Sequence, residues 1–280
     1  MLTPRWNDQR LLQIDANKED LQISARHLGP GFSCIYSARF LNEDGSGDVL
    51  FVSPIANLSL YSDDSPDISC TDGQDVPCGV EDEWCWEVNA LWLPQANEIF
   101  RMNRYGTIKQ RLTNNEFFEG ELAVSPDFRR VVFASNRDGD YDLYIADLND
   151  IDNPKRITNT IGYEGGVQFA PDGRSIAFFA WRPQSAEAQE VYRWLLSYDV
   201  TDMQRMDVYV LDLQSGEETL VTNFAALSDL PEVNKTWDVP YFSFAPTGEL
   251  YIRQDRQFYC LNLSSDATEL TEVCERLMDG

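Results

Sequence analysis

Three aspartates stand close together in the segment NRDGDYD and could supply oxygen ligands for calcium or a set of catalytic carboxylates. They are Asp138, Asp140 and Asp142. A calcium loop of the EF-hand type needs glycine at its sixth position and glutamate at its twelfth. Counted from Asp138, those positions hold Leu143 and Asn149, and a register that starts two residues earlier fails as well. Because Asp-Gly is typical of a tight turn between strands, we predict a turn, with calcium as the lesser alternative.

Other side chains that could carry out catalysis are scarce. The only histidine, His27, falls at the end of an expected strand, where a structural role is the commoner one. Serine nucleophiles have no evident partner, and the G-x-S-x-G pattern of hydrolases is absent from the sequence. Carboxylates are plentiful, but their spacing does not select a reaction.

The six cysteines favour disulfide bonds over a metal site. No C-x-x-C pair occurs, and a single histidine gives poor support for zinc. Cys260 and Cys274 are placed to join the last two strands, and two of Cys70, Cys78 and Cys85 to close a local ring. Disulfides would imply an oxidising compartment. The first 20 residues, however, contain no apolar segment of the kind that a signal peptide needs, so a cytoplasmic location stays open.

Composition indicates a folded, strongly acidic domain. The chain has 47 acidic and 22 basic residues, a net charge of −25, and a hydrophobic content of 43% that is sufficient for a core. Such a charge repels the phosphate backbone, so we expect no nucleic acid partner. No apolar run approaches the roughly 20 residues that cross a membrane, so we expect no membrane span.

Short segments with one pattern recur along the chain, as they do in repeat proteins. A strand that ends in a proline turn occurs as ELAVSPD (121–127), VQFAPDG (167–173) and FSFAPTG (243–249). A second strand follows, then an alternating aromatic strand such as YDLYIADL, and then RLTN, RITN, LVTN or ELTE. The Ser-Pro and Ala-Pro signals of the first two units are 45 residues apart, which matches one four-stranded propeller blade of about 40–50 residues. The sequence therefore predicts an all-β fold, a β-propeller of four-stranded blades.

Four blades can be traced completely and another in part, so five or six blades are expected in a single domain, residues 1–280. The partial blade is RLLQIDANKEDLQISARH (10–27), which reads as two outer strands. The ring closes with strands from both ends of the chain or belongs to a longer one. A cysteine-rich insertion (54–96) interrupts the first blade. A second insertion (184–205) has apolar residues at helical spacing, and we predict a short helix there. These apolar residues are Val191, Trp194, Leu195 and Tyr198.

The segments LTNNEFFEGELAVSPDFRRVVFASNRDGDYDLYIADL and RITNTIGYEGGVQFAPDGRSIAFFAWRP resemble the repeats of TolB-like β-propellers, also called WD40-like PD40 repeats. The resemblance covers roughly residues 31–270. It implies a six-bladed ring, a periplasmic or secreted location, and a role as a protein-binding scaffold. Similar blades form the gating domain of prolyl-oligopeptidase-type enzymes, which carry a separate hydrolase domain.

Candidate binding residues lie before the first strand of each blade, because that strand lines the channel and the preceding loop lies at its mouth. Three such loops carry an aromatic residue followed by an acid: Phe118-Glu119-Gly120-Glu121, Tyr163-Glu164-Gly165-Gly166 and Trp237-Asp238-Val239-Pro240. These groups could hold a cation or a basic peptide side chain. Alternatively, the aromatic rings pack between blades and the acids bond to neighbouring backbone. Arg182, in the segment WRP, either pairs with an acid across the mouth or fixes the insertion in place.

The sequence favours a non-catalytic scaffold that recruits a protein or peptide at the channel mouth. Two alternatives stay open. One is an enzyme, a hydrolase or lyase with acids in the channel and a metal as a further possibility. The other is a small-ligand or carbohydrate binder that uses Trp84, Trp86 and Trp237 as stacking platforms.

Overall fold

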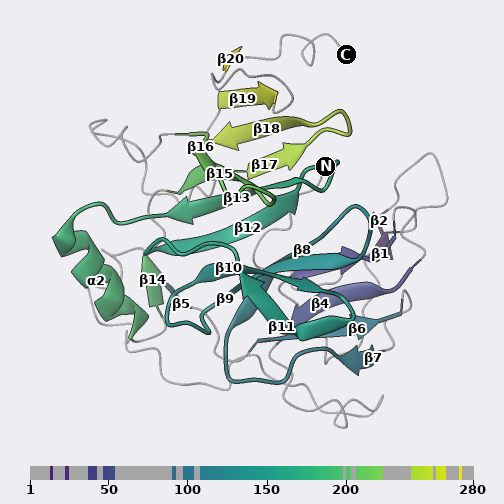
Figure 1. Ribbon diagram of the computed structural model, residues 1–280. Helices are drawn as coiled ribbons and strands as arrows, with labels where there is room; N and C mark the ends of the chain where they lie inside the picture. The colour runs from purple at the N-terminus through teal and green to yellow at the C-terminus, as the bar shows by residue number, and fades with distance from the viewer. Residues whose placement is uncertain are drawn as a thin grey trace.

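Four antiparallel sheets of four strands each form successive blades of a β-propeller (Figure 1). The computed structural model describes residues 13–14, 23–24, 37–42, 47–53, 90–92, 97–103, 108–197, 200–202, 206–222, 241–254, 257–262 and 271–272. Within each sheet the strands run in chain order from the inner to the outer edge. The prediction of an all-β propeller is therefore confirmed.

Each blade contains the strands that the repeat predicts. Blade 1 consists of β3 (Ser37–Phe40), β4 (Val49–Ser53), β6 (Glu98–Met102) and β7 (Ile108–Arg111). Blade 2 consists of β8 (Glu119–Val124), β9 (Arg130–Ser135), β10 (Asp142–Asp147) and β11 (Asp150–Arg156). Blade 3 consists of β12 (Tyr163–Phe169), β13 (Ser175–Trp181), β15 (Asp207–Asp212) and β16 (Glu218–Leu220). Blade 4 consists of β17 (Tyr241–Phe244), β18 (Glu249–Gln254), β19 (Gln257–Asn262) and β20 (Thr271–Glu272).

Five further described elements lie outside these blades. The predicted partial blade appears as a pair of short strands, β1 (Gln13–Ile14) and β2 (Ile23–Ser24), which pair antiparallel. The second insertion contains one helix, α2 (Ala186–Leu196), which is too short to span a membrane. Strands β5 (Ala90–Trp92) and β14 (Val200–Asp202) form a two-stranded sheet of their own.

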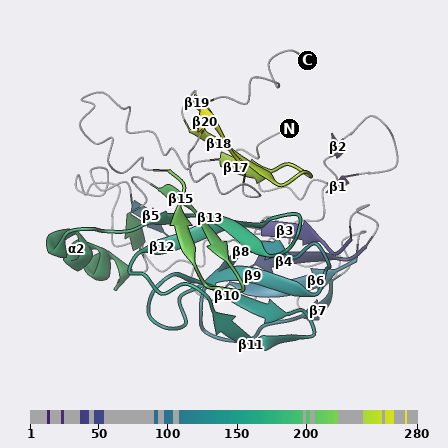
Figure 2. The same ribbon diagram turned by 45° about the horizontal axis from the view of Figure 1, so that its top comes forward.

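The first strand of each blade is the one nearest the axis of the ring. Strand β3 lies beside β8, β8 beside β12, and β12 beside β17, so these four strands are neighbours in turn. Figures 1 and 2 show the sheets following one another in the same order. The fourth strands lie at the rim, and β11 is accordingly exposed along much of its length.

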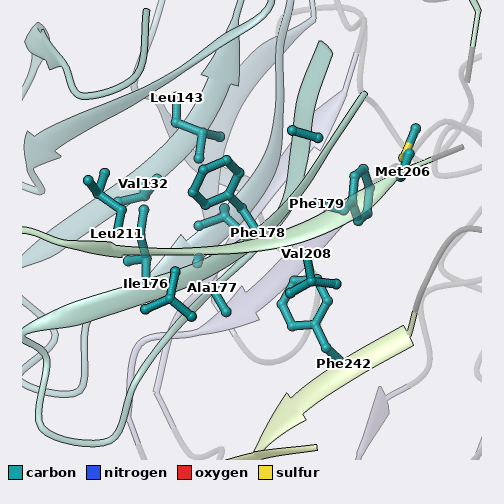
Figure 3. Packing of buried hydrophobic residues seen from close by; sticks show 14 of the residues in the cluster. Val132, Leu143, Ile176, Ala177, Phe178, Phe179, Met206, Val208, Leu211 and Phe242 are labelled. Carbon is teal, nitrogen blue, oxygen red and sulfur yellow. The ribbon is translucent and has the colours of Figure 1, made fainter. Parts of the chain in front are cut away.

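Apolar side chains from both faces of the central strands form the core. Strands β9 and β13 are buried at nearly every position because each blade packs against a blade on either side. One cluster extends across blades 2, 3 and 4, and a second joins blade 1 to blade 2. In the larger cluster, Phe242 of β17 approaches Val208 and Phe179 of blade 3 (Figure 3).

The recurring threonine has a definite structural task in three blades. The hydroxyls of Thr113, Thr158 and Thr222 each accept a backbone N–H from the third strand of the same blade at 2.8 Å. The fourth strand ends before this threonine, so the segments RLTN, RITN and LVTN mark the point where the chain leaves one blade for the next. The repeat is thus explained by a buried backbone N–H that needs an acceptor.

Candidate functional site

The two ends of the ring differ in what they carry. In an antiparallel blade the start of the first strand, the link between the second and third strands, and the end of the fourth strand lie at the same end. We call this end the insertion face, since both insertions leave the blades there; its described segments are 112–118, 136–141, 157–162, 182–197 and 221–222. The opposite end, the turn face, carries the proline turns and consists of 125–129, 148–149, 170–174, 213–217 and 245–248.

Glu119, the first of the predicted binding acids, is buried beneath the insertion face. Its carboxylate pairs with the guanidinium of Arg137 at 2.7 Å and accepts a bond from the Asn115 amide at 2.8 Å. Burial raises the pKa of Glu119 to about 7, although Thr113, Asn115 and Arg137 oppose the rise. The Glu119 side chain is therefore enclosed rather than exposed at the mouth, and its ion pair with Arg137 of the same blade holds it there.

Glu164 occupies the corresponding place in blade 3 and is also fully buried. It accepts bonds from Arg182 at 3.1 Å and from the Thr158 hydroxyl at 3.1 Å. Arg182 also pairs with Glu218 at the start of β16 and stacks on the Tyr209 ring, with its Cζ 4.1 Å from the ring centroid. Arg182 thus ties the first strand of blade 3 to the fourth.

Arg137 binds the first-strand acid of blade 2 and lies over aromatic rings, as Arg182 does in blade 3, and the sequence motifs did not indicate it. Its Cζ lies 4.9 Å from the centroid of Tyr144 and 5.4 Å from that of Phe133. A signal was available, since Arg137 and Arg182 are separated by the same 45 residues as the two proline turns. The arginine of NRDGDYD and the arginine of WRP are therefore the same position of the repeat.

The predicted aromatic residues are packed between blades. Phe118 meets Tyr141 edge-on at 5.4 Å, and Tyr141 lies 5.6 Å from Tyr163 across the junction of blades 2 and 3. The contacts continue from Tyr163 to Phe179 and from Phe179 to Phe242 of blade 4. Five rings thus connect three blades. The remaining predicted pair, Trp237 and Asp238, lies outside the described residues.

Glu121 is the predicted acid that retains partial exposure, and its backbone is unusual. It has a φ of 54° in a bulge of the innermost strand β8, at the position that Gly166 occupies in β12 with a φ of 61°. Its carboxylate accepts the Gly166 N–H at 3.2 Å. Burial raises the pKa of Glu121, and the nearby charge of Arg39 on β3 opposes this. A left-handed residue other than glycine is costly and is commonest at functional sites.

The three aspartates that could have bound calcium are each engaged by a different protein donor. Asp138 accepts from the Tyr144 hydroxyl at 2.7 Å, Asp142 pairs with Arg156, and Asp140 accepts from the Tyr192 hydroxyl. Gly139, with a φ of 88°, sits in the turn itself, so the turn prediction is confirmed. Across the described ranges, no three or more His, Cys, Asp or Glu side chains are arranged to hold a metal ion.

The two insertions join each other above the insertion face. Strand β5 belongs to the link between β4 and β6, and β14 to the link between β13 and β15; they pair through Val200–Trp92, Thr201–Leu91 and Asp202–Ala90. Helix α2 lies beside β14 on the same side of the molecule (Figures 1 and 2). The insertions of blades 1 and 3 therefore form one accessory unit.

Helix α2 is fixed to the ring by its buried side. Tyr192 and Leu195 are buried, and the Tyr192 hydroxyl lies 2.7 Å from the Gly162 carbonyl oxygen, which shares the hydroxyl hydrogen with Asp140. Val191 and Trp194, which the helical spacing put forward, are each 47% exposed. The apolar spacing located the helix correctly, but the polar partners of Tyr192 decide which side faces inward.

The cysteine predictions stay largely outside the described residues. Cys70, Cys78, Cys85 and Cys274 are not among them, whereas Cys260 is buried in β19 and is not a free thiol. No disulfide joins two residues of the described part of the chain. The predicted connectivity therefore stays a prediction.

Comparison with known proteins places this architecture among the β-propellers. No protein-family model matches the sequence, and no curated protein matches it either. A protein assigned as TolB from Agrobacterium tumefaciens has a TM-score of 0.50 and 13% identity, over 90% of this chain and 69% of that one. TolB from Acinetobacter baumannii has a TM-score of 0.41 and 17% identity, over 76% of this chain and 39% of that one. The chain is a β-propeller with structural similarity to TolB and to other propellers.

Proposed function

We propose that this protein is a non-catalytic scaffold that recruits a protein or peptide at its insertion face. The observation that carries the proposal is the distribution of exposed apolar side chains. Among the described residues, the large apolar side chains that are markedly exposed, between 39% and 48%, are Phe117, Val191, Trp194, Leu220 and Tyr241. Three of them lie at or just before the insertion-face end of a strand, and the other two lie in helix α2, which is part of the insertion face.

The strand topology explains where each of these five exposed side chains lies. Phe117 lies two residues before β8, Tyr241 begins β17, and Leu220 ends β16, while the other two belong to α2. On the turn face, the exposed described positions are instead prolines, glycines and polar or charged residues. Apolar side chains gathered at one end of a soluble domain are typical of a protein-binding surface.

The accessory unit supports the same assignment. Loops on a rigid scaffold are the usual carriers of binding residues, and both large insertions of this ring leave from one face and pair there. The enclosed ion pairs of Glu119 and Glu164 hold the blades that present these loops. In this proposal the partner contacts the exposed residues above the acids, and Glu121 lines the path toward the axis.

The wider family assignment belongs to the same proposal. The repeats around Ser125-Pro126 and Ala170-Pro171 support membership of the TolB-like propellers, in which a scaffold role is common. The cysteine content supports a periplasmic or secreted location.

A capture experiment with paired variants tests the proposal. Wild-type protein, a Phe117→Ser/Val191→Ser variant and a Pro171→Ser/Pro246→Ser variant are immobilised and exposed to an extract of the cells that produce the protein. The second variant is the matched control, because it removes two exposed apolar residues from the turn face. A protein retained by wild type and control but lost by the first variant supports the proposal. Equal retention by all three folded baits, or none by any, overturns it.

A further inference from the structure

A pair of buried carboxylates lies at each of the two best-described blade junctions. Glu98 of β6 and Glu119 of β8 meet between blades 1 and 2, and Asp142 of β10 and Glu164 of β12 meet between blades 2 and 3. All four side chains are at most 1% exposed. Each pair combines the third strand of one blade with the first strand of the next, so the arrangement belongs to the repeat.

Hydrogen-bond donors at the first junction do not satisfy both carboxylates. One oxygen of Glu98 accepts from Arg111 at 2.7 Å and from the Asn115 N–H at 2.8 Å. One oxygen of Glu119 accepts from Arg137 and from the Asn115 side chain. The second oxygen of each acid, Oε2 in both, is buried without a partner. Buried acceptors in this state are destabilising.

The second junction has the same deficit and an excess of negative charge. Asp142 bonds to Arg156 through Oδ2, whereas its Oδ1 is buried without a partner. Several charged and titratable groups act on this junction from β10, β11, β15, β16, α2 and the adjoining loops. They are Asp138, Asp140, Tyr144, Arg156, Arg182, Tyr192, Tyr209 and Glu218. Together with Asp142 and Glu164, five acids therefore face two arginines.

We propose that these blade junctions are proton-binding sites, and that proton uptake below neutral pH tightens the contact between neighbouring blades. A proton on Glu119, or on Asp142 or Glu164 at the second junction, removes one of two like charges. It also converts a buried acceptor into a donor. The arginines at these junctions already form ion pairs with the acids. A proton is the small cation that can bind to a carboxylate there without displacing them.

The expected pH window follows from the direction of the pKa shifts. Burial raises the pKa of Glu119 to about 7 and that of Asp142 to about 6, and it raises that of Glu164 well above its usual range. The folded state therefore holds more protons than the unfolded state between the unfolded pKa values near 4 and the folded values. The stabilisation is present at the acidic end of this window and is lost as the pH rises through about 6 to 7.

Thermal unfolding of two single variants tests the proposal. Wild-type Tm should be higher at pH 5.5 than at pH 7.5, and Glu119→Gln, which imitates the protonated acid, should lose a large part of that difference. Glu116→Gln is the matched control, because it makes the same change in net charge at an exposed position three residues away. It should keep the wild-type difference. Equal pH dependence in Glu119→Gln and Glu116→Gln overturns the proposal.

A calorimetric measurement on the wild type keeps the test independent of how the variants fold. Unfolding enthalpies at pH 5.5 are compared in two buffers of different ionisation enthalpy. A net release of about one proton or more on unfolding is expected. No release, or uptake of protons, overturns the proposal. A calcium-dependent Tm that Asp142→Asn abolishes would also overturn it, since the junction would then hold a metal ion.

Discussion

The hydroxyl of Tyr192 in helix α2 donates a hydrogen bond to the carboxylate of Asp140, which lies 52 residues earlier in the turn of the preceding blade. The Gly162 carbonyl oxygen lies 2.7 Å from the same hydroxyl and shares its single hydrogen with the carboxylate, and Asp140 also accepts the Gly162 N–H at 3.2 Å. One aromatic side chain therefore joins the accessory unit to both blades at a junction. The aspartate that resembled a calcium ligand is an anchor for the insertion.

Tyr192→Phe should lower the free energy of unfolding by about 2 kcal/mol, because it removes the hydroxyl hydrogen that a buried carbonyl and a carboxylate share. The ring itself keeps its packing against Trp181, so the loss reports the hydroxyl. Urea unfolding measures it. Val191→Ala, in the same helix but exposed, should change stability by less than about 0.5 kcal/mol. A loss of the same size in both variants would show that the hydroxyl is not the anchor.

Arg182→Lys should destabilise the protein by about 2 kcal/mol although the charge is kept. Lysine cannot pair with Glu164 and Glu218 together while stacking flat on Tyr209. Arg174→Lys, at an exposed position, provides the control and should leave the urea midpoint nearly unchanged. If Arg182→Lys is as stable as that control, the arginine is not needed as a planar bridge.

Gly166→Ala should lower the free energy of unfolding by about 3 kcal/mol or more. Two effects contribute, backbone strain and a steric clash, and the same substitution at Gly139 tests the first of them alone. Gly166 has a φ of 61°, and a Cβ there would lie 2.0 Å from Cε1 of Phe179. Gly139 has a φ of 88° but no atom within 4 Å of the added Cβ, so Gly139→Ala should show only the backbone cost of about 1–2 kcal/mol. Chemical denaturation of both variants gives the difference. Equal losses would mean that Phe179 can move aside.

The strands could be predicted from the sequence because their signals are local and repeated. The second strands RVVFAS (130–135) and ELYIRQ (249–254) coincide with β9 and β18, and the proline turns fix where the first strands of blades 2, 3 and 4 end. The sequence motifs predict the position of the fourth strands less accurately. Strand β11 covers Asp150–Arg156, whereas the motif RITN begins only at Arg156, because Thr158 leaves the sheet to accept an N–H of β10.

The candidate site depended on contacts that local sequence does not encode. Nothing near Ala90–Trp92 indicates pairing with Val200–Asp202, more than a hundred residues away. The acids of the insertion face were recognised as a set, but their burial depends on Arg137 and Arg182, which reach them from the next strand. The sequence motif is the same for an exposed carboxylate at a channel mouth and for a buried one beneath it. The arginine that pairs with the carboxylate distinguishes the two cases.

The threonine that ends one blade and the acid that begins the next hold the same positions at successive junctions. One blade could therefore follow another copy of itself. The Thr158 hydroxyl bonds to Glu164, and Thr113 holds the same position of the repeat before Glu119. Residues 119–158 therefore begin with the acid that faces the preceding blade and end with the hydroxyl that faces the following one. A tandem duplication of residues 119–163, one repeat of 45 residues, would therefore recreate a matched junction without any further substitution. Rings of different size can arise in this way, because the compatibility is carried at the boundaries of the duplicated unit.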